Sequence, residues 1–304
     1  MTALTPSAAA EELDSGVGEV PEVPVAGPRR SSNGNPLTSV ASWLFLLAMA
    51  TYFLFPLLAM ARFAFQRVPM ILFGWSTLFD RWTMDGLLTA FRDEEFGPTL
   101  WLSTRLAIGA IVLTLGLMLP TAMWVHLRIP SARGLVETLT VLPYVVPPIA
   151  LVVGVIGAYR DTLPWFFNSR FSLIPFYAII AMPFTYRALD AGLRAIDLRT
   201  LVDASRSLGA GWGTTMWRVL MPNLRTSLLT SSFLTATVVM GEFTMAQIMG
   251  KFTLPVFTVQ FYQREVQGGL ALGLVSLVAT TFLLALVTFL TRRRGAAASI
   301  TRGI

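Results

Sequence analysis

Long apolar runs separated by short polar segments dominate the chain from about residue 41 onward. A helix needs about 20 mainly apolar residues to cross a bilayer. Six runs approach this length and predict membrane-spanning helices at residues 43–61, 99–125, 138–158, 171–186, 226–249 and 269–290. The pattern therefore predicts an all-α, polytopic membrane protein with six transmembrane helices and both termini on one side of the membrane.

The polar segments at the ends of these runs indicate the orientation. Basic residues are more frequent in cytoplasmic loops than in outer loops. When both termini are placed in the cytoplasm, most of the 23 Lys and Arg residues fall on internal segments. The segment at residues 187–225 then becomes the longest and most basic cytoplasmic loop. Both termini are therefore expected to be cytoplasmic.

The two ends of the chain differ from this apolar region. Residues 1–40 are rich in Pro, Gly, Ser, Ala and acidic residues and lack apolar periodicity, which predicts a disordered cytoplasmic tail. Residues 41–294 form the predicted permeation domain, and residues 295–304 a second cytoplasmic tail. The outer segment 64–98 combines aromatic and acidic residues and predicts short helices at the outer interface.

Composition supports lipid as the main environment and excludes several other classes. Hydrophobic residues make up 54% of the chain and charged residues 13%, against about 25% charged residues in soluble domains. The net charge of +6 is spread over the ends of apolar runs. No nucleic-acid partner is therefore expected, whereas membrane lipid is. The absence of cysteine excludes disulfides and thiol catalysis.

The cytoplasmic loop 193–224 contains a short amphipathic helical pattern interrupted by glycines. Thr200 and Asp203 have capping-box spacing, so a helix is expected to begin directly after Thr200. Gly209 and two further glycines interrupt the periodicity and permit a sharp turn. A second helical piece ends at Pro222. The segment predicts a helix–turn–helix elbow outside the membrane, suited to the groove of another protein.

This loop resembles the EAA loop of type I ABC importer permeases, the inner-membrane components of binding-protein-dependent transport systems. The family pattern is Glu-Ala-Ala, three residues, Gly, nine residues, Ile, any residue and Leu-Pro. The spacing matches throughout, with Asp, Ser, Val and Met as conservative departures. The matching residues are Asp203, Ala204, Ser205, Gly209, Val219, Met221 and Pro222. Segments 116–122 and 142–154 resemble the second and third spans of the family, and the resemblance covers about residues 43–292.

The resemblance implies the permease fold of that family and a division of labour in the cytoplasmic (inner) membrane of a bacterium. In the family, the loop docks on a cytoplasmic ABC ATPase dimer, so residues 197–222, with Leu208 among them, are expected to couple ATP hydrolysis to the spans. A second permease subunit, a different paralogous chain, and an extracytoplasmic solute-binding protein are the other implied partners. Asp203 is expected to cap its helix, to contact the ATPase, or both.

ATP is expected on the partner subunits and no cofactor in this chain. A phosphate-binding P-loop requires Gly-Lys-Ser/Thr with an upstream glycine. The sole lysine, Lys251, precedes Phe252, and Met245 stands where that glycine is required. The chain is therefore not expected to be an enzyme. No His, Asp and Glu cluster has metal-ligand spacing, and the single histidine, His126, is interpreted as a structural residue at the membrane interface.

Charged and polar residues inside the apolar runs are the candidates for a translocation path or gate. Glu242 lies in the fifth run beside Gly241, which permits close helix contact, and Gln247 extends the polar strip. Arg105 is the one charge in the second run. Two interpretations of Glu242 stay open: it lines the outer part of the path, or it is buried and paired with Arg105.

The expected function is that of the permease subunit of an importer most like the polyamine, iron, thiamine and phosphonate branch. A single intramembrane carboxylate suits a cation, which points to a spermidine- or putrescine-type substrate. The alternative is a stand-alone secondary transporter or channel, for which inverted repeats or several intramembrane charges are expected. Neither feature is apparent in the sequence. An intramembrane enzyme is disfavoured because no paired acids or Ser/Lys constellation lies in the spans.

Overall fold

A computed structural model describes residues 36–67, 77 and 81–300, and most of the predicted N-terminal tail lies outside these residues. The described residues are almost entirely helical, with an isolated β-bridge between Gln66 and Trp82. The helices are α2 (Pro36–Phe65), α3 (Asp85–Arg92), α4 (Phe96–Arg128), η3 (Pro130–Ala132), α5 (Arg133–Val145), α6 (Pro148–Tyr159), α7 (Pro164–Asn168), α8 (Leu173–Arg194), α9 (Leu198–Ser207), α10 (Trp212–Thr214), η4 (Thr215–Leu220), α11 (Met221–Gly241), α12 (Thr244–Ile248), α13 (Leu254–Arg264) and α14 (Val266–Ile300). The predicted all-α class is confirmed for the described residues.

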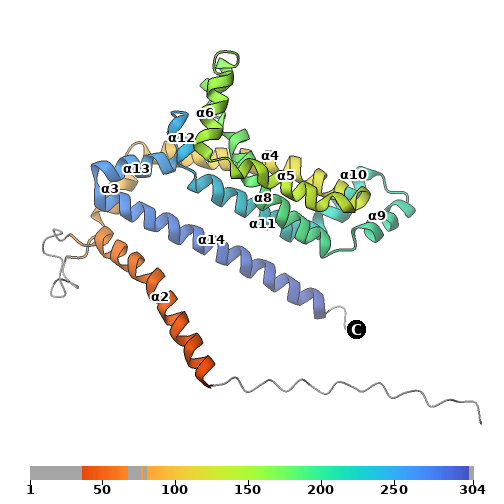
Figure 1. The fold of residues 1–304 in the computed structure, drawn as a ribbon, viewed down its shortest axis with the longest axis horizontal. Helices are drawn as coiled ribbons and strands as arrows, with labels where there is room; N and C mark the ends of the chain where they lie inside the picture. Colours follow the sequence, from red (N-terminus) through yellow and green to blue (C-terminus); the bar gives the residue numbers. More distant parts are fainter. Residues whose placement is uncertain (1–35, 68–76, 78–80, 301–304) are drawn as a thin grey trace, which may run out of the picture. The chain divides into compact units, whose positions relative to one another are not determined.

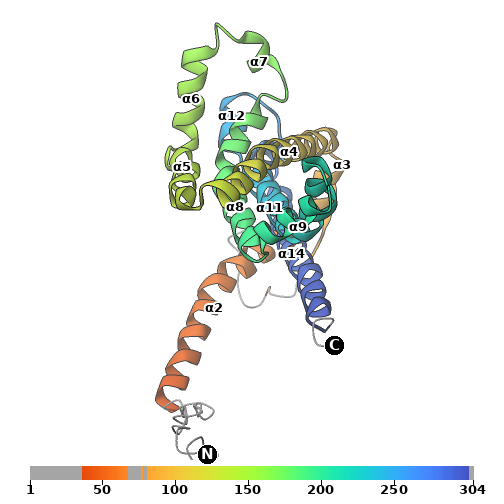
Figure 2. The ribbon, with the colours of Figure 1, turned by 90° about the vertical axis from the view of Figure 1, so that its right-hand side faces the viewer.

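Three helices are each long and apolar enough to cross a bilayer, at Ser39–Phe65, Phe96–Arg128 and Val266–Leu286. The predicted third span is instead a broken pair, α5 and α6, bent by 81°. Figure 2 shows α6 leaving the direction of α5. Pro147 and Pro148 lie at the break, where proline removes the N–H groups that would continue the helix.

The fourth and fifth predicted spans fall on α8 and α11, which are less apolar than the other spans. The fifth run is not one helix, because α11 ends at Gly241 and α12 follows after a short break. The six-span count and the orientation of the termini therefore stay predictions. The outer segment contains one of the short helices expected there, α3, while residues 68–76 and 78–80 lie outside the described residues.

The chain divides into two units, residues 1–54 and 55–304. In the first unit, the described part of α2 presents large apolar side chains such as Trp43 and Phe53 to the outside, as expected of a helix in lipid. In the second unit, α8 packs against both α4 and α11, and α14 packs against α3 and α13. Figure 1 shows α9 and α10 at one end of the α4–α8–α11 bundle and α12 and α13 at the other.

Small residues allow the bundle helices to approach closely. A Cβ atom at Gly192 of α8 would overlap the side chain of Ser227 of α11. The hydroxyls of Thr185 and Thr235 join the same two helices by a buried hydrogen bond of 2.9 Å. Helices in lipid associate through such close contacts and interhelical hydrogen bonds, because the hydrophobic effect does not drive them together there. This contact fixes α8 and α11, the helices on either side of the loop, against each other.

Candidate functional site

Helix α9 begins three residues before the point predicted from the sequence. Its N-cap is Asp197, whose carboxylate accepts the backbone N–H of Thr200 at 3.2 Å and the Thr200 hydroxyl at 2.7 Å. These hydrogen bonds hold the pKa of Asp197 below its usual value. Asp203 therefore lies in the second turn and is exposed to solvent. Asp197, and not Asp203, therefore caps α9, and the Asp203 side chain is accessible to a partner protein.

The turn after α9 is built on Gly209, as its position in the motif predicts. Gly209 has φ +81°, the left-handed conformation that glycine adopts at little cost. The Gly209 N–H donates to the carbonyl of Arg206 at 2.9 Å, and the Ala210 N–H donates to that of Ser205 at 3.1 Å. This pair of bonds is the Schellman ending of a helix. It leaves the side chain of Leu208 88% exposed at the tip of the loop.

A buried hydroxyl pair fastens α9 to the following segment. The hydroxyls of Ser205 and Thr215 lie 2.8 Å apart, and the Thr215 hydroxyl lies 3.2 Å from the carbonyl oxygen of Gly211. Thr215 begins η4, a π-helical turn that runs directly into α11. The serine in place of the family's second alanine thus has a specific partner. The sequence did not reveal this pair, since Thr215 lies outside the motif and meets Ser205 only after the turn closes.

The remaining motif residues divide between an anchored side and an exposed side. Leu198 and Val202 of α9 lie in one buried apolar cluster with Leu220 and Leu224, which belong to η4 and α11. Val219 and Met221 are half-buried and pack against this cluster, and Pro222 is exposed in the first turn of α11. The residues on the exposed side, called the loop face below, are Asp203, Ala204, Leu208 and Gly209.

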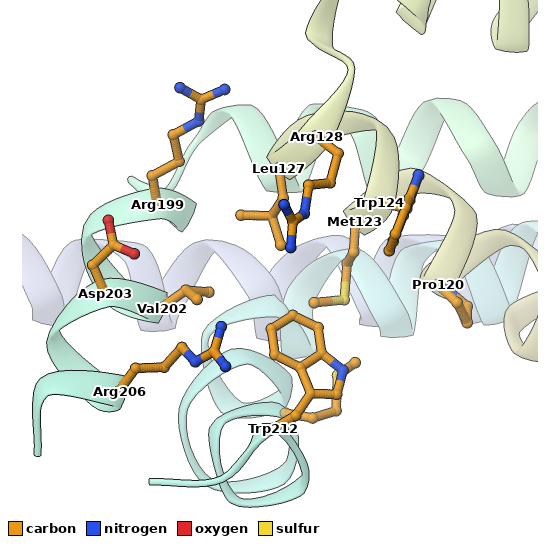
Figure 3. Close-up of a pocket in the computed structure, with 11 residues that line it drawn as sticks. Pro120, Met123, Trp124, Leu127, Arg128, Arg199, Val202, Asp203, Arg206 and Trp212 are labelled. Carbon is orange, nitrogen blue, oxygen red and sulfur yellow. The ribbon is translucent and has the colours of Figure 1, made fainter. Parts of the chain in front are cut away.

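A cavity of about 690 Å³ lies beside the loop face, between the C-terminal end of α4 and the segment from α9 to η4. Figure 3 shows its residues. It is lined by Pro120, Met123, Trp124, Leu127, Arg128, Arg199, Val202, Asp203, Arg206, Trp212 and Met216. The α4 wall is mainly apolar and aromatic and ends in a charged residue, whereas the α9–η4 wall mixes charged side chains with apolar and aromatic ones. We call it the loop cavity.

A charge cluster that the sequence analysis did not identify joins the helices next to the loop. The Asp190 side chain of α8 is 11% exposed and accepts from His126 Nε2 at 2.7 Å and from Arg133 at 3.1 Å. Arg194, one turn further along α8, lies 2.5 Å from the other carboxylate oxygen. Burial by itself raises the pKa of Asp190, but these hydrogen bonds outweigh it and lower the pKa below its usual value.

The cluster connects the end of α4, the start of α5 and the end of α8. His126, interpreted from the sequence as a structural residue, is one of its members. The sequence offers a weak signal for it, namely an acid and an arginine spaced four apart near the end of an apolar run. The other two partners come from distant segments, so only the packing of α4 and α5 against α8 brings the cluster together.

Three of the predicted path residues, Gly241, Glu242 and Gln247, belong to the segment from the end of α11 to α12, and α12 lies at the opposite end of the bundle from α9 and α10 (Figure 1). Glu242 follows the last residue of α11, and its carboxylate oxygens accept the Met245 N–H at 2.9 and 3.0 Å, which caps α12. Arg105 instead lies over the ring of Trp101, with 4.6 Å from its Cζ atom to the ring centroid. Among the described residues, no ion pair joins Glu242 and Arg105. The alternative that these two residues pair is therefore wrong.

Gly241 does not make the close helix contact expected of it. A Cβ atom added there would have no neighbour within 4 Å. Gln247 is exposed and lines a cavity of about 320 Å³. The other residues around this cavity are Phe243, Val259, Gln260, Gln263 and Arg264. Three amide side chains and a guanidinium thus surround a small space with no carboxylate in its lining.

Comparison with known proteins identifies the family. Residues 113–295 match the family described as binding-protein-dependent transport system inner membrane component. The chain is 30% identical over 221 residues to the sulfate transport system permease protein CysW of Synechocystis sp., covering 66% of this chain and 79% of that protein. It is 26% identical over 239 residues to a probable molybdenum ABC transporter permease protein of Haloferax volcanii, covering 75% and 83%.

A solved structure supports the fold. A bacterial ABC transporter involved in the import of the acidic polysaccharide alginate contains a chain that matches with a TM-score of 0.61 at 14% identity, over 84% of this chain and 97% of that one. None of these three proteins is named for a polyamine, so the predicted polyamine substrate is not supported. The stand-alone carrier is also excluded by the family match. The chain belongs to the inner-membrane components of binding-protein-dependent transport systems, and it is a multi-pass ABC importer permease of the inner membrane.

Proposed function

We propose that this chain is one of two paralogous permease subunits that together form the translocation path of an ATP-driven importer. An extracytoplasmic binding protein delivers the solute, and a cytoplasmic ABC ATPase dimer, on separate chains, supplies the energy. In this proposal six spans cross the membrane and both termini face the cytoplasm. The loop 197–222 docks on the ATPase. The observation that carries the proposal is the loop face, which is exposed while the opposite side of α9 is anchored to η4 and α11.

The anchoring explains how a movement at the loop face can reach the far end of the bundle. The Ser205–Thr215 bond and the apolar cluster around Val202 hold α9 against η4. From η4 the chain continues without interruption through α11 to Gly241, a distance of about 30 Å at 1.5 Å per residue. Glu242 then caps α12. A displacement of α9 by the ATPase is thereby transmitted to the segment beside the second cavity.

Replacing Leu208 with Glu tests the docking proposal. A charge at this exposed tip should reduce ATPase copurification with the complex more than tenfold, as expected when a central contact of an interface is lost. Leu163→Glu is the matched control, because Leu163 is also an exposed leucine but precedes α7, far along the chain from the loop. Equal ATPase retention by the two variants would contradict docking through the loop face.

We infer that the substrate is an oxyanion of the sulfate or molybdate type. The Glu242 carboxylate is engaged by the N-terminal end of α12, so it is not a free counter-ion for a cation. The second cavity offers the amides of Gln247, Gln260 and Gln263 together with Arg264, whose guanidinium also forms a long, partly exposed ion pair with Asp93 at 3.7 Å. Neutral amide donors with one guanidinium suit an oxyanion. The names of the sulfate and molybdenum relatives support the same class.

Uptake of radiolabelled sulfate, molybdate and spermidine into proteoliposomes containing the whole complex tests this inference. One of the two oxyanions should accumulate in an ATP-dependent manner. Arg264→Gln should reduce its uptake by about tenfold, the effect of losing one charge-assisted hydrogen bond. Arg160→Gln, which also removes an arginine but lies outside the cavity lining, should leave uptake unchanged. Accumulation of spermidine alone would contradict the oxyanion assignment.

A further inference from the structure

We propose that the loop cavity is a binding site for the phosphate head group of an anionic phospholipid. This proposal rests on the membrane location of the family and not on docking of the ATPase. It concerns the cavity between α4 and α9, whose volume of about 690 Å³ falls in the range of small-molecule sites. The path assigned to the solute lies at the other end of the bundle.

The charges around the loop cavity favour an anion. Three arginines and one aspartate line it, which leaves two net positive charges. Figure 3 shows the guanidinium group of Arg128 directed down toward Trp212 and that of Arg206 directed toward Trp212 from the side, whereas that of Arg199 is directed away. Arg128 lies 5.8 Å from the centroid of the Trp124 ring, and none of the ion pairs among the described residues involves these three arginines.

Two like charges that face one space repel each other unless an anion lies between them. Planar guanidinium groups bind phosphate oxygens in a bidentate manner, so Arg128 and Arg206 supply donors of the required geometry. Asp203 lies on α9, as Arg206 does, and Figure 3 shows Asp203 on the far side of Val202 from Arg128. The cavity thus presents two of its three guanidinium groups to a shared space and has its carboxylate at the edge.

The other wall of the cavity identifies a lipid as the source of the phosphate. Pro120, Met123 and Leu127 belong to the last turns of α4, which is a membrane-spanning helix by length and composition. They lie within about 12 Å of the end of this helix. Trp124 and Arg128 occupy the level at which tryptophan and arginine meet head groups. Apolar side chains from the last turns of α4 thus lie beside arginines at the polar end of the same cavity, an arrangement that matches an amphiphile. Basic pockets of this kind bind anionic lipids.

Occupancy of this cavity has a structural effect on the loop. A phosphate between Arg128 and Arg206 bridges α4, a bundle helix, and α9, the helix that carries the loop face. The lipid is therefore expected to hold α9 against the bundle in addition to the Ser205–Thr215 bond. Removing it should loosen α9 without changing the bundle contacts.

The test uses the complex purified with its co-expressed partner chains, in nanodiscs of phosphatidylglycerol and phosphatidylcholine. Native mass spectrometry counts the phosphatidylglycerol molecules that stay bound across a titration of this lipid. The Arg128→Gln/Arg206→Gln variant should bind the tightest molecule roughly 25-fold more weakly, which is about fivefold for each of the two basic groups removed. The Arg218→Gln/Arg225→Gln variant removes two arginines outside the cavity lining and should bind as wild type.

Two further arms keep the result interpretable. The Arg128→Lys/Arg206→Lys variant retains both charges but loses the bidentate donors, so its binding should lie between that of wild type and that of the Arg128→Gln/Arg206→Gln variant. Binding as weak as that of the Arg128→Gln/Arg206→Gln variant would contradict an electrostatic site. Inorganic phosphate added to phosphatidylcholine nanodiscs should not raise the unfolding temperature. An increase equal to that given by phosphatidylglycerol would assign the cavity to a free oxyanion and overturn the lipid proposal, as would unchanged lipid binding by the Arg128→Gln/Arg206→Gln variant.

Discussion

Asp190 should contribute more to stability than any exposed ion pair in the chain, and Asp190→Asn measures this contribution. The substitution keeps the shape of the side chain and one acceptor oxygen but removes the charge that serves three donors. Removing one member of a buried ion pair costs about 3–5 kcal/mol, because the remaining charges lose their partner. Arg133 and Arg194 are 29% and 57% exposed and can regain water, so we reduce the expected loss to about 2–3 kcal/mol.

The assay is thermal unfolding of the purified chain in detergent, followed by circular dichroism. A loss of this size should lower the unfolding midpoint by roughly 4–12 °C. The matched control is Glu137→Gln, which removes the partner of Arg187 at 2.9 Å in a pair that is 40% and 62% exposed. Exposed pairs contribute about 0–1 kcal/mol. A midpoint for Asp190→Asn no lower than that of Glu137→Gln would refute the reasoning.

The same variant has a defined pH dependence. Because the folded state lowers the pKa of Asp190 below its ordinary value of 3.8, the stabilisation is fully present above that value and is lost as the pH falls through the folded-state pKa. The difference in midpoint between wild type and Asp190→Asn should therefore not shrink between neutral pH and about pH 5, where the neighbouring His126 can gain a proton, and should narrow only below about pH 4. A difference that disappears near pH 6 would contradict this assignment.

Two further predictions concern backbone features at the two ends of the bundle. Gly209→Ala should destabilise the chain by about 1 kcal/mol through its left-handed backbone alone, whereas Gly211→Ala, with φ −71°, should change the unfolding midpoint little; equal effects would exclude the turn as the cause. Glu242→Gln retains an acceptor for the Met245 N–H and should retain transport, whereas Glu242→Leu removes the cap and should reduce it. Loss of uptake in Glu242→Gln would show that the charge itself is required.

The sequence predicted the loop better than its surroundings, for physical reasons. The turn at Gly209 follows from local backbone preference, and the spaced motif located it to the residue. The predicted start of α9 was wrong because Asp197 and Thr200 are both residue types that cap helices. Asp197 is the N-cap, since its carboxylate accepts the backbone N–H of Thr200, the third residue of the helix. The break in the third span falls at Pro147 and Pro148, which cannot continue a helix, but its angle depends on packing.

The Asp190 cluster could not be predicted from the sequence. It requires the end of α4 and the start of α5 to meet the end of α8. His126 and Arg133 both precede Asp190 by more than 50 residues. The same holds for Ser205 with Thr215, which are only ten positions apart but meet across a turn. Interactions within one helix can be predicted from spacing, whereas interactions between elements depend on the fold that brings them together.

The bend between α5 and α6 restricts what can lie beside it in the membrane. Pro147 and Pro148 carry no N–H, so the carbonyl groups of Pro143 and Tyr144 cannot accept the hydrogen bonds that a continuous helix would give them. In hydrocarbon each unsatisfied carbonyl costs several kcal/mol. Lipid tails are therefore unfavourable neighbours of this corner, and water or the polar groups of a neighbouring chain would satisfy these carbonyl groups. In the proposed importer, this corner belongs on a side of the subunit that is turned away from the bilayer.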